Sequence, residues 1–373
     1  MTDSTSIPLT PAGVAADDGG YGGLLDDSLK RFFWNAVRTS LRRPSQAYFF
    51  YRTVQWQRRA ARLRSEWLRQ GVQVPPIAIF SITNRCNLHC KGCYHQALRA
   101  SAESEVSDDK LRSIIAEARE LGISFMVLGG GEPLVRKEIV AITKDFPEII
   151  FLVFTNGLLI DDDLLRRLSR QRNFVPIVSL EGHEADTDGR RGKGVYERLR
   201  KTMVKLQSKG IFFGTSLTLT RPNFATLTDA QFVEDLVDSG CRLFFYVEYT
   251  AIVEGTEDWV ITEEQRANVA GLVNSFRDRF PALFVAIPGD EEEFGGCLSA
   301  GRGFIHISAE GNVEPCPFAP YSDASLKDLS LKEALQSDFL KAIRENQEEL
   351  GEGEGGCALW EKREWVRSLL HAE

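Results

Sequence analysis

Three cysteines crowd into one short segment of the sequence, SITNRCNLHCKGCYHQ, where Cys86, Cys90 and Cys93 follow an apolar run. Closely spaced thiolates in proteins typically hold iron–sulfur clusters or zinc. A [4Fe-4S] cube held by three thiolates leaves one iron free to bind another ligand. The alternative is a structural zinc site completed by His89 and His95, but such sites favour paired CxxC knuckles over this spacing. The segment therefore predicts a three-thiolate [4Fe-4S] cluster.

A second group of cysteines lies towards the end of the chain. Cys297 and Cys316 enclose the segment CLSAGRGFIHISAEGNVEPCPF, in which Gly311 is expected to form the turn of a hairpin. Cys357 follows a glycine-rich joint. Ordinary buried thiols, or a zinc site completed by His306, are the alternatives to a second cluster. The odd total of seven cysteines argues for metal ligation in a reducing compartment and against a disulfide framework.

Alternating apolar runs and polar segments predict the elements that position these cysteines. The six apolar runs cover residues 77–83, 124–128, 149–154, 174–180, 211–219 and 242–250. The six helix-favouring segments cover residues 107–121, 136–145, 161–171, 195–209, 227–239 and 262–279. Such repeats favour parallel strands with right-handed crossovers, so the fold class is α/β, with a partial (β/α)6 barrel of the TIM type. Chemistry is expected at the carboxyl ends of the strands, where the Cys86 segment falls, whereas Cys241, at the start of the sixth run, is expected to be core.

Composition divides the chain into four parts. Residues 1–25 are rich in Gly, Ser, Thr and Asp and are expected to be disordered. Residues 26–72 form a helical arm and residues 73–285 the barrel. Residues 286–373 form a small module with a hairpin and helical stretches over 326–349 and 358–370. Neither a membrane-spanning apolar run nor a signal-peptide pattern is present, so a cytoplasmic location is expected.

The helical arm is strongly basic. Between residues 30 and 69 there are eleven Lys or Arg residues and one acidic residue, Glu66, although the whole chain has a net charge of −8. Nine aromatic residues share this stretch. We expect the arm to dock its aromatic side chains on the barrel, and the alternative is peripheral contact with an anionic membrane. Binding to nucleic acid is not expected.

From about residue 77 to residue 370 the motifs resemble those of the radical S-adenosylmethionine (radical SAM) superfamily. The resemblance implies that the free iron of the cluster on Cys86, Cys90 and Cys93 binds SAM. An electron from the cluster then cleaves the sulfonium, and the resulting 5'-deoxyadenosyl radical abstracts a hydrogen atom from the substrate. It also implies an electron donor of the flavodoxin or ferredoxin type.

The glycine-rich segment VLGGGEPL follows the second apolar run. Gly130, Gly131 and Glu132 resemble the GGE motif of the superfamily, in which glycine backbone and a carboxylate receive the SAM ammonium. One position departs from the pattern. The residue before the third cysteine is often aromatic or histidine and helps to hold adenine, but here it is Gly92, with Tyr94 just after the cysteine. The resemblance therefore leaves the adenine contacts unassigned.

The segments TNG and SLEG end the third and fourth apolar runs. By resemblance, Asn156 belongs to the cofactor site, Ser179 and Glu181 hydrogen-bond the ribose hydroxyls, and Arg191 pairs with the SAM carboxylate. A surface turn at Asn156 and a solvated basic patch at Arg191 are the alternatives. Residues 248–249, Glu-Tyr, end the sixth run and face either the barrel mouth or the core.

The spacing C-x13-G-x4-C from Cys297 to Cys316 resembles the opening of SPASM and twitch domains, which carry auxiliary clusters. Only Cys357 follows, so twitch is the better match, with one auxiliary [4Fe-4S] cluster whose fourth ligand is open. The resemblance implies a radical SAM oxidoreductase or transferase acting on a small metabolite, a peptide or a lipid. The alternative is a non-catalytic iron–sulfur electron carrier or sensor, although a carrier needs no SAM site.

Overall fold

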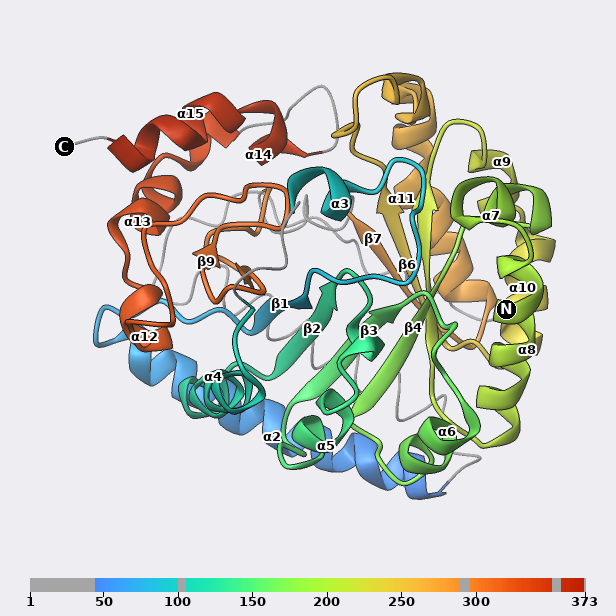
Figure 1. Ribbon diagram of the computed structural model, residues 1–373, viewed down its shortest axis with the longest axis horizontal. Helices are drawn as coiled ribbons and strands as arrows, with labels where there is room; N and C mark the ends of the chain where they lie inside the picture. Colours follow the sequence, from blue (N-terminus) through green and yellow to red (C-terminus); the bar gives the residue numbers. More distant parts are fainter. Residues whose placement is uncertain (1–43, 100–104, 289–295, 351–356, 372–373) are drawn as a thin grey trace, which may run out of the picture.

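One nine-stranded sheet forms the centre of the computed structural model, which describes residues 44–99, 105–288, 296–350 and 357–371 (Figure 1). The strands lie in the order β7-β6-β5-β4-β3-β2-β1-β8-β9. They are β1 Ile77–Thr83, β2 Phe125–Gly130, β3 Ile150–Thr155, β4 Phe174–Leu180, β5 Gly214–Leu219, β6 Leu243–Glu248, β7 Leu283–Ile287, β8 Phe304–Ile307 and β9 Val313–Glu314. All neighbours pair in parallel except β8 and β9, which are antiparallel. The predicted α/β partial barrel is confirmed, and β7 is a strand that the apolar runs did not predict.

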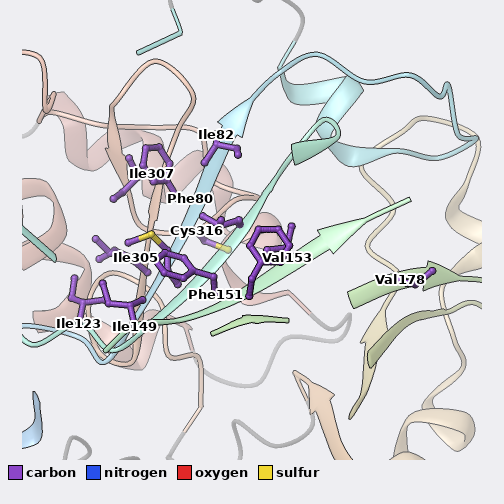
Figure 2. Packing of buried hydrophobic residues seen from close by; sticks show 14 of the residues in the cluster. Phe80, Ile82, Ile123, Ile149, Phe151, Val153, Val178, Ile305, Ile307 and Cys316 are labelled. Carbon is purple, nitrogen blue, oxygen red and sulfur yellow. The ribbon is translucent and has the colours of Figure 1, made fainter. Parts of the chain in front are cut away.

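Helices follow the strands in sequence and cover the outer side of the sheet (Figure 1). They are α4 Asp108–Leu121, α5 Ile139–Lys144, α6 Asp162–Leu168, α7 Glu184–Arg191, α8 Val195–Ser208, α9 Phe224–Leu227, α10 Ala230–Asp238 and α11 Glu263–Arg279. Polar side chains cap their first turns; Ser107, Asp161 and Thr262 each accept a backbone N–H. Figure 2 shows the buried layer, in which Phe80 and Phe151 of the barrel strands belong to the same cluster as β8. Close packing of this layer fixes the strand ends that carry the site.

Helix α2, Pro44–Leu68, lies across the end of the barrel where the strands begin (Figure 1). Val54 on α2 is buried in one cluster with Phe125, Ile150, Val175 and Leu243 from the starts of four strands. The helix therefore docks on the barrel, as the arm was expected to do, while residues 26–43 of the arm lie outside the described residues. The opposite face of α2 is exposed and basic, and it carries Arg52, Arg58, Arg59 and Arg62, with Arg69 directly after the helix.

Contact of this basic face with an anionic membrane stays a prediction. We expect the wild-type chain to float with phosphatidylglycerol vesicles and the variant Arg58→Glu/Arg62→Glu to lose flotation, because each arginine near an anionic surface contributes about 1 kcal/mol. Glu66→Gln is the matched control on the same helix. Equal recovery of wild type with neutral and anionic vesicles would remove the proposal. Among the described helices, none is both long and apolar enough to cross a membrane.

The C-terminal residues extend the barrel sheet. Strand β8 pairs with β1, so that Phe304 lies opposite Ile77. The predicted hairpin is present, and Gly311 has a φ of +91° in its turn, which favours glycine. The two helical stretches predicted here are each broken, into α12 Leu331–Ala334 and α13 Asp338–Glu345, and into α14 Ala358–Glu361 and α15 Arg363–Ser368. The first break occurs because Ser337 accepts the Leu340 N–H and starts α13 as a new helix.

Candidate active site

The first three cysteines lie in the loop after β1, at the carboxyl end of the sheet, with half-buried side chains. Burial raises the pKa of Cys86 most, and Cys90 and Cys93 raise it further. Burial also raises the pKa of Cys90, while Arg191 opposes that shift. The thiols are therefore close enough to disfavour one another's ionisation. Iron would supply the positive charge that reverses this, because metal ligation deprotonates thiols, so the donor set fits a cluster.

The glycine loop after β2 packs directly on the backbone of the cysteine loop. A Cβ on Gly131 would lie 2.2 Å from the carbonyl oxygen of Arg85, and one on Gly130 would lie 2.2 Å from that of Thr83. The backbone N–H groups of Gly131 and Glu132 donate to these same two carbonyls, each at 2.8 Å. Glycine is required at both positions because the two backbones touch. The glycines thereby fix the position of the cysteine loop.

Glu132 is buried and joins the end of β2 to the end of β3. Its Oε1 accepts hydrogen bonds from Thr155 Oγ1 at 2.7 Å and from the Leu134 N–H at 3.0 Å, and its Oε2 accepts from the Asn156 N–H at 2.7 Å. Burial raises the pKa of Glu132 most, and these hydrogen bonds oppose the shift. A carboxylate accepts about four hydrogen bonds, so roughly one position remains for an external donor such as an ammonium.

Asn156 is buried and faces the cysteine loop, so the surface-turn alternative is wrong. Its Nδ2 donates to Asn87 Oδ1 at 2.7 Å, and its Oδ1 accepts the Leu158 N–H at 3.1 Å. Sequence analysis missed Asn87, whose only signal was its place directly after Cys86. The pair of asparagines links the loop after β3 to the cysteine loop.

Glu181 and Arg191, which the resemblance assigned to different parts of SAM, pair with each other. Glu181 Oε1 accepts from Arg191 Nε at 2.8 Å and Nη2 at 2.5 Å, while Oε2 accepts from Arg190 Nη1 at 2.7 Å. Both arginine side chains are largely buried, which contradicts a solvated basic patch. Burial would lower the pKa of Arg191, but Glu181 and Cys90 raise it, and the net shift is upward. Sequence analysis missed Arg190, although it adjoins Arg191.

Aromatic rings from the segment after β6 fill the space beside Gly92: Tyr249 follows the strand directly, and Trp259 lies in the short 3-10 helix Glu257–Trp259. A Cβ on Gly92 would lie 2.5 Å from Tyr249 Oη and 2.8 Å from Trp259 Cζ3. The guanidinium of Arg190 lies over the Tyr249 ring, 5.6 Å from its centroid. Tyr249 therefore faces the cysteine loop, whereas Glu248 forms an ion pair with α11. The rings of Tyr249 and Trp259 occupy the space that a side chain at position 92 would need, so this position requires glycine.

The second set of cysteines also comes together. A hydrogen bond with Cys357 raises the pKa of Cys316 most, followed by burial and the nearby thiols of Cys357 and Cys297. Cys316 closes the β8–β9 hairpin and belongs to the buried cluster drawn in Figure 2. Three thiols at one place, from the hairpin and the segment before α14, suit a metal cluster better than chance burial.

His306 is not available to complete a zinc site with these thiols. Its Nε2 lies 2.8 Å from Ser81 Oγ, and its Nδ1 lies 2.7 Å from Glu314 Oε2, so both ring nitrogens have partners. All three side chains are buried. Within the part of the chain that the structure describes, no three His, Cys, Asp or Glu side chains, the two sets of thiols included, are grouped closely enough to hold a single metal ion. A [4Fe-4S] cube does not need three donors on one ion, because each of its thiolates binds a different iron.

Comparison with known proteins gives one family and several relatives. The Radical SAM superfamily matches residues 80–237. Fe-coproporphyrin III synthase of Methanosarcina barkeri is 28% identical over 198 residues, which are 52% of this chain and only 49% of that protein. AdoMet-dependent heme synthase of Nitratidesulfovibrio vulgaris is 24% identical over 76% of this chain and 85% of that protein. SuiB of Streptococcus suis bound to S-adenosylmethionine shares the fold, with a TM-score of 0.64 at 17% identity over 79% of this chain and 73% of that one.

Proposed function

Because the chain belongs to the radical SAM superfamily of enzymes, we propose that it cleaves SAM reductively and abstracts a hydrogen atom from its substrate. The observation that supports this most is the meeting of three thiols with a glycine loop and a buried arginine pair at one end of the barrel. A [4Fe-4S] cluster on Cys86, Cys90 and Cys93 would supply the electron and one open iron. The protein supplies position and excludes water.

The side chains around the cluster loop divide the work of binding SAM. We assign the remaining acceptor position of Glu132 to the SAM ammonium and the guanidinium of Arg191 to its carboxylate. Glu181, which already holds both arginines, keeps Arg191 beside Cys90. Ser179, half-buried on β4, is the remaining candidate for a ribose hydroxyl. Gly130, Gly131 and Asn156 act by holding the loops together.

Reductive cleavage of SAM tests this proposal. Anaerobically reconstituted wild type with dithionite is expected to form 5'-deoxyadenosine, and Cys90→Ala to form none, because two thiolates hold the cluster too weakly. Cys241→Ala, which removes a buried core thiol far from the cysteine loop in sequence, is the matched control and should retain cleavage. Wild type that carries the cluster yet yields no 5'-deoxyadenosine would support the electron carrier or sensor instead.

The aromatic rings beside Gly92 give a second prediction, on SAM affinity. We propose that Trp259 and Tyr249 supply the adenine contact that position 92 provides in relatives. Trp259→Ala should raise the Kd for SAM roughly two- to tenfold, the equivalent of about 0.5–1.5 kcal/mol of aromatic stacking. Calorimetric titration of the cluster-loaded protein measures this, with Trp56→Ala on α2 as control. An unchanged Kd in Trp259→Ala would place adenine elsewhere.

The substrate class is supported by the inner face of the sheet. Four half-buried apolar side chains on this face pack against the hydrophobic cluster that also holds Val54 of α2: Leu152, Phe154, Val247 and Val285. The inner face of the sheet above α2 is therefore apolar. We propose an apolar or aromatic substrate, a description that covers a porphyrin-like metabolite, an apolar peptide side chain and a lipid. The names of the relatives include a heme synthase, and SuiB has been solved with its precursor peptide SuiA. Electrons would come from a flavodoxin- or ferredoxin-type donor.

We further propose an auxiliary [4Fe-4S] cluster on Cys297, Cys316 and Cys357. Its support is the hydrogen bond and electrostatic contact among these thiols. Three protein ligands again leave one iron open, to substrate or to a fourth ligand. The iron content of a variant without these three thiols tests this directly.

A further inference from the structure

Two aromatic side chains join the two sets of thiols. Tyr94 follows Cys93 directly and begins helix α3, Tyr94–Leu98. Its ring packs edge-on against the ring of Phe318, with the centroids 4.7 Å apart and the planes at 64°. Phe318 lies two residues beyond Cys316, and its backbone N–H donates a hydrogen bond to the Cys316 sulfur. The contacts therefore run from Cys93 along the chain to the Tyr94 ring, across to the Phe318 ring, and through the Phe318 backbone to Cys316.

The hydroxyl of Tyr94 reports the same arrangement. Burial raises its pKa most, and Cys93 and Cys316 are the next two causes. Tyr94 therefore lies near both cysteines, although the two are far apart in the sequence.

We propose that Tyr94 and Phe318 form the route by which single electrons pass between the auxiliary cluster and the SAM-binding cluster. This inference rests on the proposed function, because it requires both clusters. In the step itself no bond forms or breaks: the reduced auxiliary cluster loses one electron and the oxidised SAM-binding cluster gains it. Packed side chains that bridge two sites can couple them, and these two rings bridge one ligand of each set. Other described elements offer no comparable ring pair next to a ligand of each set.

Packing alone is the competing explanation, since two rings also seal the contact between α3 and the hairpin. The two explanations differ in which changes matter. A route through the rings tolerates Tyr94→Phe, which removes only the hydroxyl, but not Tyr94→Leu or Phe318→Leu. A packing role predicts lower stability in the leucine variants and no change in the rate of electron transfer.

The experiment follows both clusters after a single supply of electrons. The full chain is loaded with both clusters, reduced, freed of reductant and mixed with SAM, and freeze-quench EPR and Mössbauer spectra record each cluster over time. In wild type and Tyr94→Phe we expect the auxiliary signal to decay after the SAM-binding cluster is oxidised, and 5'-deoxyadenosine to exceed one equivalent per chain. In Tyr94→Leu and Phe318→Leu we expect this decay to be lost, and Tyr48→Leu, an exposed residue on α2, to behave as wild type.

The outcomes separate this inference from the proposed function. No 5'-deoxyadenosine in wild type defeats the proposed function itself. Cleavage of one equivalent with an auxiliary cluster that stays reduced in wild type overturns the route, whatever the variants do. Decay in Tyr94→Leu at the wild-type rate, with both clusters loaded, also overturns it.

Discussion

Gly131→Ala is expected to prevent the loop after β1 from holding its cluster, with a loss of about four irons per chain after reconstitution. The added Cβ would lie 2.2 Å from the carbonyl oxygen of Arg85 and 2.5 Å from its carbonyl carbon. Real Cβ atoms do not approach backbone this closely, and neither partner is a side chain that can swing away. The cysteine loop must therefore move, and the geometry that lets three thiolates share one cluster is lost.

Gly129→Ala, two residues earlier and within β2, is the matched control. A Cβ at Gly129 would meet nothing within 4 Å, so this variant should keep its iron and its SAM cleavage. Iron and sulfide analysis, with the EPR signal of the reduced cluster, measures the difference, and thermal unfolding checks that both variants fold. A Gly131→Ala protein that retains full iron and wild-type cleavage would show that the two loops can separate without consequence.

The triple variant Cys297→Ala/Cys316→Ala/Cys357→Ala is expected to halve the iron content. Wild type with two four-iron clusters should hold about eight irons and the variant about four, all of them in the cluster on the β1 loop. Mössbauer spectra of the reconstituted proteins measure this and identify the cluster type. The iron should be lost because Cys316 has Cys357 and Cys297 as close neighbours, so the variant removes every thiol at this place. The other described cysteines are the three of the β1 loop and Cys241.

The matched control replaces the three cysteines of the β1 loop instead. Cys86→Ala/Cys90→Ala/Cys93→Ala should also hold about four irons but should lose SAM cleavage, whereas the C-terminal triple variant should keep some cleavage. Equal iron in wild type and the C-terminal variant would make Cys297, Cys316 and Cys357 structural thiols. The protein would then be a single-cluster enzyme whose C-terminal hairpin only shapes the site.

Most strands and helices of the barrel could be predicted from the sequence, because the patterns that indicate them are local. Apolar runs of five to nine residues separated by capped helices are readable without knowledge of their partners, and β1 and β4 begin and end where the runs do. Strand β8 was expected only as half of a hairpin. Its pairing with β1 joins residues far apart in sequence, and nothing in the segment Phe304–Ile307 specifies that neighbour.

The residues of the site likewise fall into those that the sequence predicts and those that it does not. The cysteine loop, the glycine pair and Glu132 could be found because each lies in a compact motif. The contacts of Glu181 with two arginines could not be, because they depend on how α7 returns toward the cysteine loop. The filling of the space beside Gly92 by Tyr249 and Trp259 was equally hidden, since a missing side chain gives no hint of what replaces it. Departures from a motif are thus informative mainly about tertiary neighbours.

The pairing of β8 with β1 limits how this protein can be divided. The backbone ladder from Ile77 to Phe80 uses the C-terminal hairpin as its outer neighbour. A barrel cut after residue 285 would expose β1 as an unpaired edge, directly beneath the cysteine loop, and such edges recruit strands from other chains. If the C-terminal segment is exchanged between relatives, the register of β8 against β1 must be kept. A shift by one residue would turn the core side chains of β8 to the opposite face of the sheet. The natural unit for engineering is the whole nine-stranded sheet.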